Sequence, residues 1–127
     1  MISISKNFKN YSINCCAVKM GKDLNVSIYG GDISHIGAVS LGVPRPSLEC
    51  INKISSSVSL ITVTGHKEDL IVQNAAKYLA SSLNCTVVVS CGIHIKNITF
   101  KEITELNSII DELLEELACL YKKVLSV

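Results

Sequence analysis

Apolar and polar residues alternate along Leu24-Asn25-Val26-Ser27-Ile28-Tyr29. A period of two is typical of a strand that buries one face and leaves the other open. The turn Met20-Gly21-Lys22-Asp23 precedes this stretch, and residues 10–19 before it form a second candidate strand. Because so short a turn joins them, the two strands are predicted to form an antiparallel hairpin.

Three further strands and two helices are predicted after the hairpin, with the strands at 36–43, 55–64 and 86–90 and the helices at 65–83 and 99–125. Gly30-Gly31-Asp32 is expected to break the ladder, and Pro44 to end the strand that precedes it. Thr99 and Glu102 have the spacing of a capping box at the start of the last helix. The order β-β-β-β-α-β-α indicates an α+β fold: a mainly antiparallel sheet with helices on one face, the C-terminal helix being long.

Composition limits the classes of function. The 127 residues suit one domain spanning 1–127, and a hydrophobic share of 48% against 18% charged residues favours a homodimer or a large ligand pocket. A net charge of +1 without a basic run argues against nucleic acid as a partner. No apolar run reaches the length of a membrane span, so no membrane partner is expected.

The six cysteines form no CxxC pair. With no signal peptide in view, they are interpreted as free thiols of a cytoplasmic protein. Cys15 and Cys16 are adjacent, so in a strand they should point to opposite faces. Cys91, which precedes Gly92, is interpreted as core filler.

Arg45 is the chain's one arginine, and it stands between the only two prolines, Pro44 and Pro46. A guanidinium grips a carboxylate or phosphate with two parallel hydrogen bonds, and the prolines would hold it in place. The alternative is an ordinary surface arginine in a proline-rich turn.

The three histidines, His35, His66 and His94, each have a glycine within two residues. They are predicted at strand ends or helix starts, where glycine lets backbone approach a ligand closely. Taken together they suggest one shared site; taken singly, each is a structural or exposed histidine. A three-histidine zinc site with an open fourth position is a weaker alternative.

The segment Thr64-Gly65-His66-Lys67 lies at a strand-to-helix turn and is the best candidate anion site. Free amide groups and the helix dipole favour negative charge there, and Lys67 adds a cation. The alternative is a plain helix cap. The chain has neither the GxxxxGK spacing of a Walker A loop nor a GxGxxG fingerprint, and it lacks GxSxG and HExxH motifs.

Other polar residues near these segments have a structural and a functional interpretation. Asp32 would orient a histidine, hold a ligand hydroxyl or start an Asx turn, the last being most common. Asn97 either caps its loop or touches a ligand. Glu68 and Asp69 are interpreted as charges in the first turn of the helix.

Four segments, taken in order, resemble the LpdD family: residues 30–39, 43–47, 64–69 and 92–99. The resemblance spans roughly residues 20–115. Members of that family were first described as small subunits of gallate-type hydroxyarylic acid decarboxylases, and are regarded as prenylated-flavin chaperones. The family fold is similar to that of the proteasome assembly chaperones, small α+β proteins that form dimers.

The resemblance implies a cytoplasmic, non-catalytic chaperone that binds prenylated FMN, or FMN itself, and supports a UbiD-type decarboxylase, with a flavin prenyltransferase as a second partner. The family motif falls on Gly30, Gly31, Asp32, His35, Gly37, Pro44, Arg45, Gly65, His66, Lys67, Glu68, His94 and Asn97. The residues expected to bind the cofactor are Asp32, His35, Arg45, Gly65, His66, Lys67, His94 and Asn97.

We assign the flavin phosphate to Arg45, Lys67 and the amides of Gly65 and His66, and the isoalloxazine to His35 and His94. Two alternatives stay open. One is a three-histidine metal-dependent enzyme, and the other is a purely structural accessory subunit of a decarboxylase.

Overall fold

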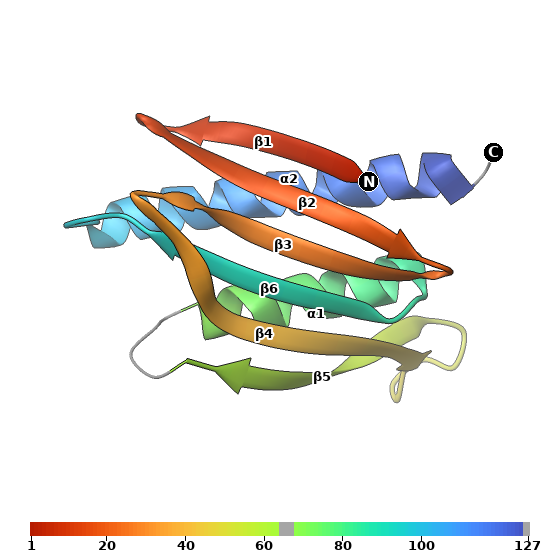
Figure 1. Cartoon of the computed structure of the whole chain (residues 1–127). Helices are drawn as coiled ribbons and strands as arrows, with labels where there is room; N and C mark the ends of the chain where they lie inside the picture. The colour runs from red at the N-terminus through yellow and green to blue at the C-terminus, as the bar shows by residue number, and fades with distance from the viewer. Residues whose placement is uncertain (64–67, 126–127) are drawn as a thin grey trace.

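The computed structural model describes residues 1–63 and 68–125. Within them, six strands form one sheet in the order β1-β2-β3-β6-β4-β5, and both helices lie on the same face of it (Figure 1). The elements are β1 (Ile2–Phe8), β2 (Tyr11–Met20), β3 (Asp23–Gly31), β4 (Ile33–Pro46), β5 (Ile54–Thr62), α1 (Asp69–Leu83), β6 (Val87–His94) and α2 (Phe100–Leu125). Of the strand pairs in these residues, β3 with β6 is the parallel one, so the predicted α+β class and mainly antiparallel sheet are confirmed.

The predicted hairpin is β2 and β3. Cys15 pairs with Ile28 and Ala17 with Val26, and all four side chains are buried toward the helices. Burial on alternate positions of both strands matches the alternation in the sequence, because successive side chains of a strand point to opposite faces.

The strands differ from the prediction at several points, including the start of β4 at Ile33 instead of Ile36 and the end of β6 at His94 instead of Ser90. Strand β1 was not predicted; it adds to the hairpin through β2, and Ile2 and Ile4 pack against the core. Strand β3 continues through Gly30 and Gly31, so the predicted break is confined to Asp32. Strand β4 runs past Pro44 to Pro46.

The extension past Pro44 has a simple cause. Pairing of β4 with β6 ends at Gly42, whereas pairing with β5 continues to Pro46. Beyond Gly42 the strand has a neighbour on one side, and a proline nitrogen, which cannot donate a hydrogen bond, is tolerated on the free side.

Both helices bury an apolar stripe against the sheet. In α1 the stripe includes Val72, Ala76 and Leu79, and the helix ends as predicted at Asn84, which has a left-handed φ of 50°. The predicted capping box of α2 is confirmed. The Thr99 amide donates to Glu102 Oε1 at 3.1 Å, and the Glu102 amide donates to Thr99 Oγ1 at 3.1 Å.

The adjacent cysteines do point to opposite faces. Burial raises the pKa of the Cys15 thiol to about 12. Cys16 lies on the open face of the sheet, where hydrogen bonds with Ser3, at 3.4 Å, and then Tyr29, at 3.5 Å, lower the pKa of its thiol. Cys91 is buried in β6, as expected of core filler, and burial followed by the charge of Glu68 raises its pKa to about 12.

In the part of the chain that the structure describes, neither helix has the length and apolarity that a membrane crossing requires.

Candidate functional site

The candidate site lies at one end of the central strands of the sheet, where β3 ends, β4 begins and β6 ends. Here His94 pairs with Gly31 on one side and with Ile33 on the other. The Asp32 amide closes the corner by donating to the His94 carbonyl oxygen at 2.6 Å. The chain between β3 and β4 therefore wraps around the end of β6, which brings residues 31–35 and 94 together.

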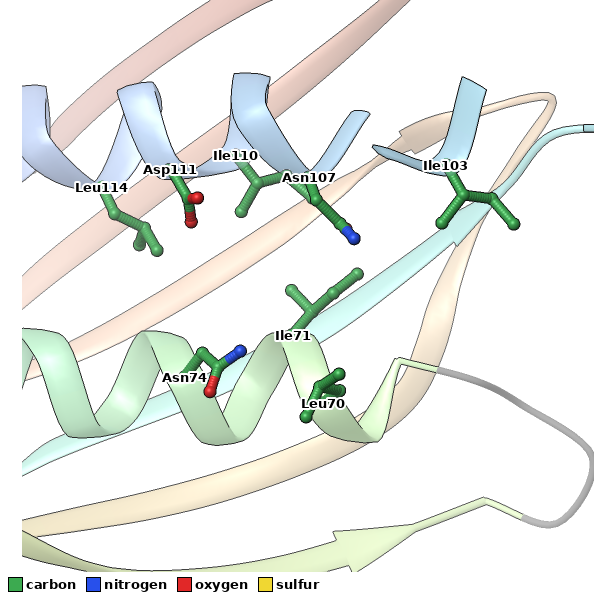
Figure 2. Close-up of a pocket in the computed structure, with 8 residues that line it drawn as sticks. All are labelled: Leu70, Ile71, Asn74, Ile103, Asn107, Ile110, Asp111 and Leu114. Atoms are coloured by element: carbon green, nitrogen blue, oxygen red, sulfur yellow. The ribbon is translucent and has the colours of Figure 1, made fainter. Parts of the chain in front are cut away.

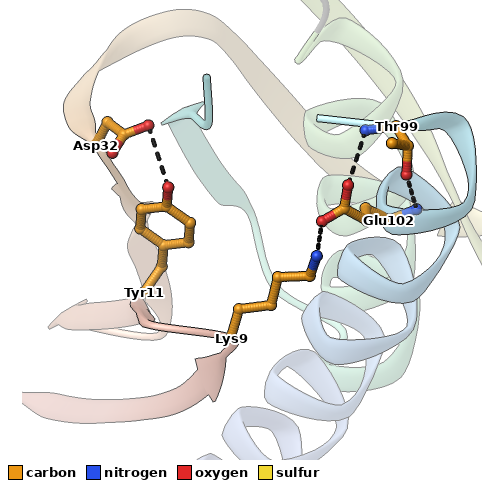
Figure 3. Close-up of polar contacts among 5 residues, drawn as sticks. All are labelled: Lys9, Tyr11, Asp32, Thr99 and Glu102. Carbon is orange, nitrogen blue, oxygen red and sulfur yellow. Dashed lines mark hydrogen bonds and ion pairs between the residues drawn. The ribbon is translucent and has the colours of Figure 1, made fainter. Parts of the chain in front are cut away.

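Asp32 fastens this corner to its surroundings. Its Oδ2 atom accepts a hydrogen bond from the Lys96 amide at 2.8 Å and a longer one from the Tyr11 hydroxyl at 3.4 Å (Figure 3). Partial desolvation, and then the charge of Asp32, raise the pKa of Tyr11. These long-range contacts give Asp32 a structural role at the corner, and they leave its carboxylate at the site.

His35 is carried by a bulge in β4. Ser34 pairs with Ile93 and Ala38 with Cys91. Between these two pairs β4 advances by four residues and β6 by two. The extra residues push the backbone of His35 against Gly92, where a Cβ atom would overlap the His35 carbonyl. A bulge next to a glycine re-aims the side chain that it carries.

The ring of His35 is held from beneath by Glu68, the residue before α1. Nε2 of His35 lies 3.1 Å from Oε1 of Glu68, whose residue is only 6% exposed. The Ile93 amide donates to the same oxygen at 3.4 Å. Gly37 leaves the space for this carboxylate, because a Cβ atom there would collide with it.

Protein groups contact both nitrogens of the His35 ring. Nδ1 is 3.2 Å from the Ile33 carbonyl oxygen, and Nε2 faces Oε1 of Glu68 at 3.1 Å. A ligand in this region therefore meets the face or the carbon edge of the ring.

A hollow of ≈ 310 Å³ opens over this pair, and Ile33, His35, Ile36 and His94 line it. Ile33 and Ile36 are 60% and 63% exposed, which is high for isoleucine. Apolar side chains beside imidazole rings suit a flat, partly apolar ligand that stacks.

The other predicted site residues are placed as follows. Asn97 lies three residues after the end of β6 and has a left-handed φ of 59°. Gly65, His66 and Lys67 lie outside the described residues. The contact of Glu68 with His35 shows that α1 begins next to the site.

Arg45 is at the other end of β4, about ten residues or roughly 30 Å from His35 along the strand. Its Nε donates to Ser57 Oγ at 2.8 Å and its Nη1 to the Pro46 carbonyl oxygen at 3.2 Å. A single chain does not bring Arg45 to the histidines.

Glu68 was interpreted from the sequence as a charge in the first turn of a helix, and its contact with His35 was not foreseen. The available signal was Gly37, whose place in the motif marks a position where a side chain does not fit. The three-histidine metal alternative loses support at His35, whose nitrogens are both engaged. No group of three metal-binding side chains occurs within residues 1–63 and 68–125.

Comparison with models of protein families shows which family the chain belongs to. The model of the prenylated flavin chaperone LpdD-like domain matches residues 7–122. The chain belongs to the LpdD-like family. The match includes all of β2, α1, β6 and the described site, and it extends further toward the N-terminus than the resemblance seen in the sequence. A prenylated flavin chaperone is therefore the function that the family supports.

A search of curated proteins finds no match. Among solved structures, the chain is similar to one in the crystal structure of a novel chaperone complex for yeast 20S proteasome assembly. The identity is 12%, the alignment covers 90% of this chain and 99% of that chain, and the TM-score is 0.50. At this identity the likeness shows the fold alone, and the predicted LpdD-like family and proteasome-assembly-chaperone-like fold are confirmed.

Proposed function

We propose that this LpdD-like protein binds prenylated FMN in the hollow over His35 and Glu68 and passes it, without turnover, to a UbiD-type decarboxylase. The observation that carries the proposal is the hollow lined by Ile33, His35, Ile36 and His94, in which a buried carboxylate fixes one ring. The end of β3, the start of β4, the residue before α1 and the end of β6 meet there, and three of the four segments that carry the family resemblance contribute to them.

The chemistry of the lining fits the ring system of the ligand. Prenylated FMN has a flat polar ring and an added apolar ring. The imidazoles of His35 and His94 offer faces for stacking, and the isoleucines offer apolar contact. A hollow of ≈ 310 Å³ suits the ring system and leaves the ribityl phosphate outside it.

The phosphate is proposed to lie toward the start of α1, where Gly65, His66 and Lys67 precede Glu68. Amide groups at a helix N-terminus favour an anion. Arg45 belongs to this proposal only as a contribution from a second copy, since it lies at the far end of β4.

A homodimer is proposed to form through the open face of the sheet. On that face Val39 pairs with Ile61, and Leu41 with Val88. Leu41, Val43 and Ile61 are 38%, 43% and 74% exposed. Leu41→Glu should convert the dimer to a monomer in sedimentation velocity, whereas Asn25→Glu on the same face of β3 should not. A wild-type monomer would refute this part of the proposal.

The binding proposal is tested by co-expression with a flavin prenyltransferase, followed by a visible spectrum of the purified protein and mass spectrometry of the released ligand. Stoichiometric prenylated FMN is expected. Ile36→Ala should lower the bound fraction, whereas Ile51→Ala, a matched change at a 90% exposed isoleucine in the connection between β4 and β5, should not. A colourless protein that stays colourless after anaerobic addition of the cofactor would contradict the proposal.

Delivery is tested separately. The loaded protein is mixed with an apo UbiD-type decarboxylase, the two are separated, and the cofactor in each is measured by mass spectrometry. Transfer is expected faster than release of the cofactor into buffer. Equal rates would leave a binding protein without a delivery role.

A further inference from the structure

The two helices leave an open groove between them, away from the site described above. It consists of adjoining hollows of ≈ 230 and ≈ 280 Å³, both bounded by Asn74 on α1 and by Asp111 and Leu114 on α2. Figure 2 shows the side chains of α1 and α2 pointing toward each other across the first of these hollows.

The groove has apolar walls. Ile71 and Ile110 lie within it, and Leu70, Ile103 and Tyr78 extend it while remaining 61%, 39% and 38% exposed. The stretch from Leu70 to Tyr78 is roughly 12 Å long at 1.5 Å per residue. This length accommodates about two turns of a third helix lying alongside α1 and α2.

The negative charge of α2 favours a positively charged partner for this groove. Between Glu102 and Tyr121 the helix carries six carboxylates and neither lysine nor arginine, whereas the whole chain has a net charge of +1. Glu102 pairs with Lys9, and Glu112 with Lys6 at 3.5 Å, both on the side of β1. Asp111 and Glu115 instead line the groove, where both are exposed.

We propose that the groove between α1 and α2 binds an amphipathic helix of a partner protein that presents lysine or arginine next to its apolar stripe. The apolar walls would receive the stripe, and Asp111 and Glu115 would pair with the cations at the edge. Two amides, Asn74 and Asn107, add polar contacts that a purely apolar partner would leave unused.

This inference does not rest on flavin binding. The groove nevertheless begins at Leu70, two residues after Glu68, so a helix bound there would touch the first turn of α1 beside the flavin hollow.

The test uses two fluorescein-labelled synthetic peptides of about 15 residues, long enough for an amphipathic helix. Both carry leucine at helical spacing; one has lysine at the flanking positions and the other has glutamate. Fluorescence anisotropy with the full-length protein should show the lysine peptide binding at least about tenfold more tightly than its glutamate twin. Equal binding of the two would overturn the proposal.

Matched variants locate the site. Asp111→Lys with Glu115→Lys should weaken the lysine peptide at least about tenfold, whereas Glu105→Lys with Glu116→Lys, the same charge change on α2 outside the groove, should weaken it much less. Leu70→Ser with Ile103→Ser should also weaken binding. All these positions are exposed, and thermal unfolding of each variant checks its fold. If the two charge variants weaken binding equally, or the serine variant binds normally, the groove is not the docking site.

Discussion

Oε1 of Glu68 lies 3.1 Å from Nε2 of His35, and the residue that supplies this carboxylate is only 6% exposed. The contact joins the start of α1 to the bulge of β4. It fixes the ring of a histidine that lines the hollow, and so it connects the stability of the fold with the shape of the site.

Gly37→Ala tests this connection. The new Cβ atom would meet the Glu68 carboxylate, so we expect a loss of about 1–3 kcal/mol in the free energy of unfolding, measured by urea denaturation. In the double variant Gly37→Ala, Glu68→Ala, the alanine at 37 should cost much less than it does alone, because its collision partner has gone. Additive losses would show that the glycine is needed for another reason.

Two substitutions of His94 distinguish stacking from hydrogen bonding in the proposed flavin site. We expect His94→Ala to weaken prenylated FMN about tenfold and to change its visible absorbance, and His94→Phe, which keeps an aromatic face, to retain most of the affinity. Titration of the purified variants with FMN and with the prenylated cofactor measures both effects. If neither His94→Ala nor His35→Ala alters the absorbance of the bound flavin, the histidines do not contact the ring.

Arg45→Ala tests the proposed phosphate contact. Loss of one charge-assisted hydrogen bond, about 1.5–3 kcal/mol, should weaken FMN by at least about tenfold and leave riboflavin, which has no phosphate, unchanged. Because one chain keeps Arg45 far from His35, mixing Arg45→Ala with His94→Ala protein should restore some intact sites if the dimer shares them. An unchanged affinity for FMN would remove Arg45 from the site.

The contacts of Glu102 predict a particular response to acid. The hydrogen bond from Lys9, and then those from Thr99, lower the pKa of Glu102 to about 2 from its ordinary value of 4.5 (Figure 3). The unfolded chain therefore takes up a proton that the folded chain does not. The stabilisation is complete above pH 4.5 and is lost as the pH falls toward 2.

Urea midpoints at pH 5 and pH 2.5 measure this effect. Glu102→Gln should make stability fall less over that interval than in the wild type, whereas Glu105→Gln, at an exposed position of the same helix, should not. Equal slopes for all three proteins would mean that other carboxylates account for the acid response.

The elements that could be predicted from the sequence are those with strong local signals. The hairpin of β2 and β3 followed from alternation around a turn, and the start of α2 from the spacing of Thr99 and Glu102. Strand β1 was missed although Ile2 and Ile4 alternate with serine, because a single short alternation has no local partner signal. The end of β4 was misplaced because Pro44 indicates a strand end unless the missing neighbour on one side is known.

Three residues that meet at the candidate site could be singled out from the sequence, but their arrangement could not. His35, His94 and Asp32 were singled out from their glycine-rich context and the resemblance, and the structure brings them together through pairing of β6 with both β3 and β4. That pairing is non-local, so no local pattern could place Glu68 under His35 or Arg45 at the other end of β4.

The central place of β6 has a consequence for how the molecule is made. This strand lies between β3 and β4 in the sheet, but it follows both of them, and β5 and α1 as well, along the chain. During translation β3 and β4 must wait with open edges until residues 87–94 leave the ribosome, and open edges are where nascent chains mispair. The hollow over His35 is completed by the same late strand, because His94 lines it, so the proposed flavin site cannot form before residue 94 has been synthesised.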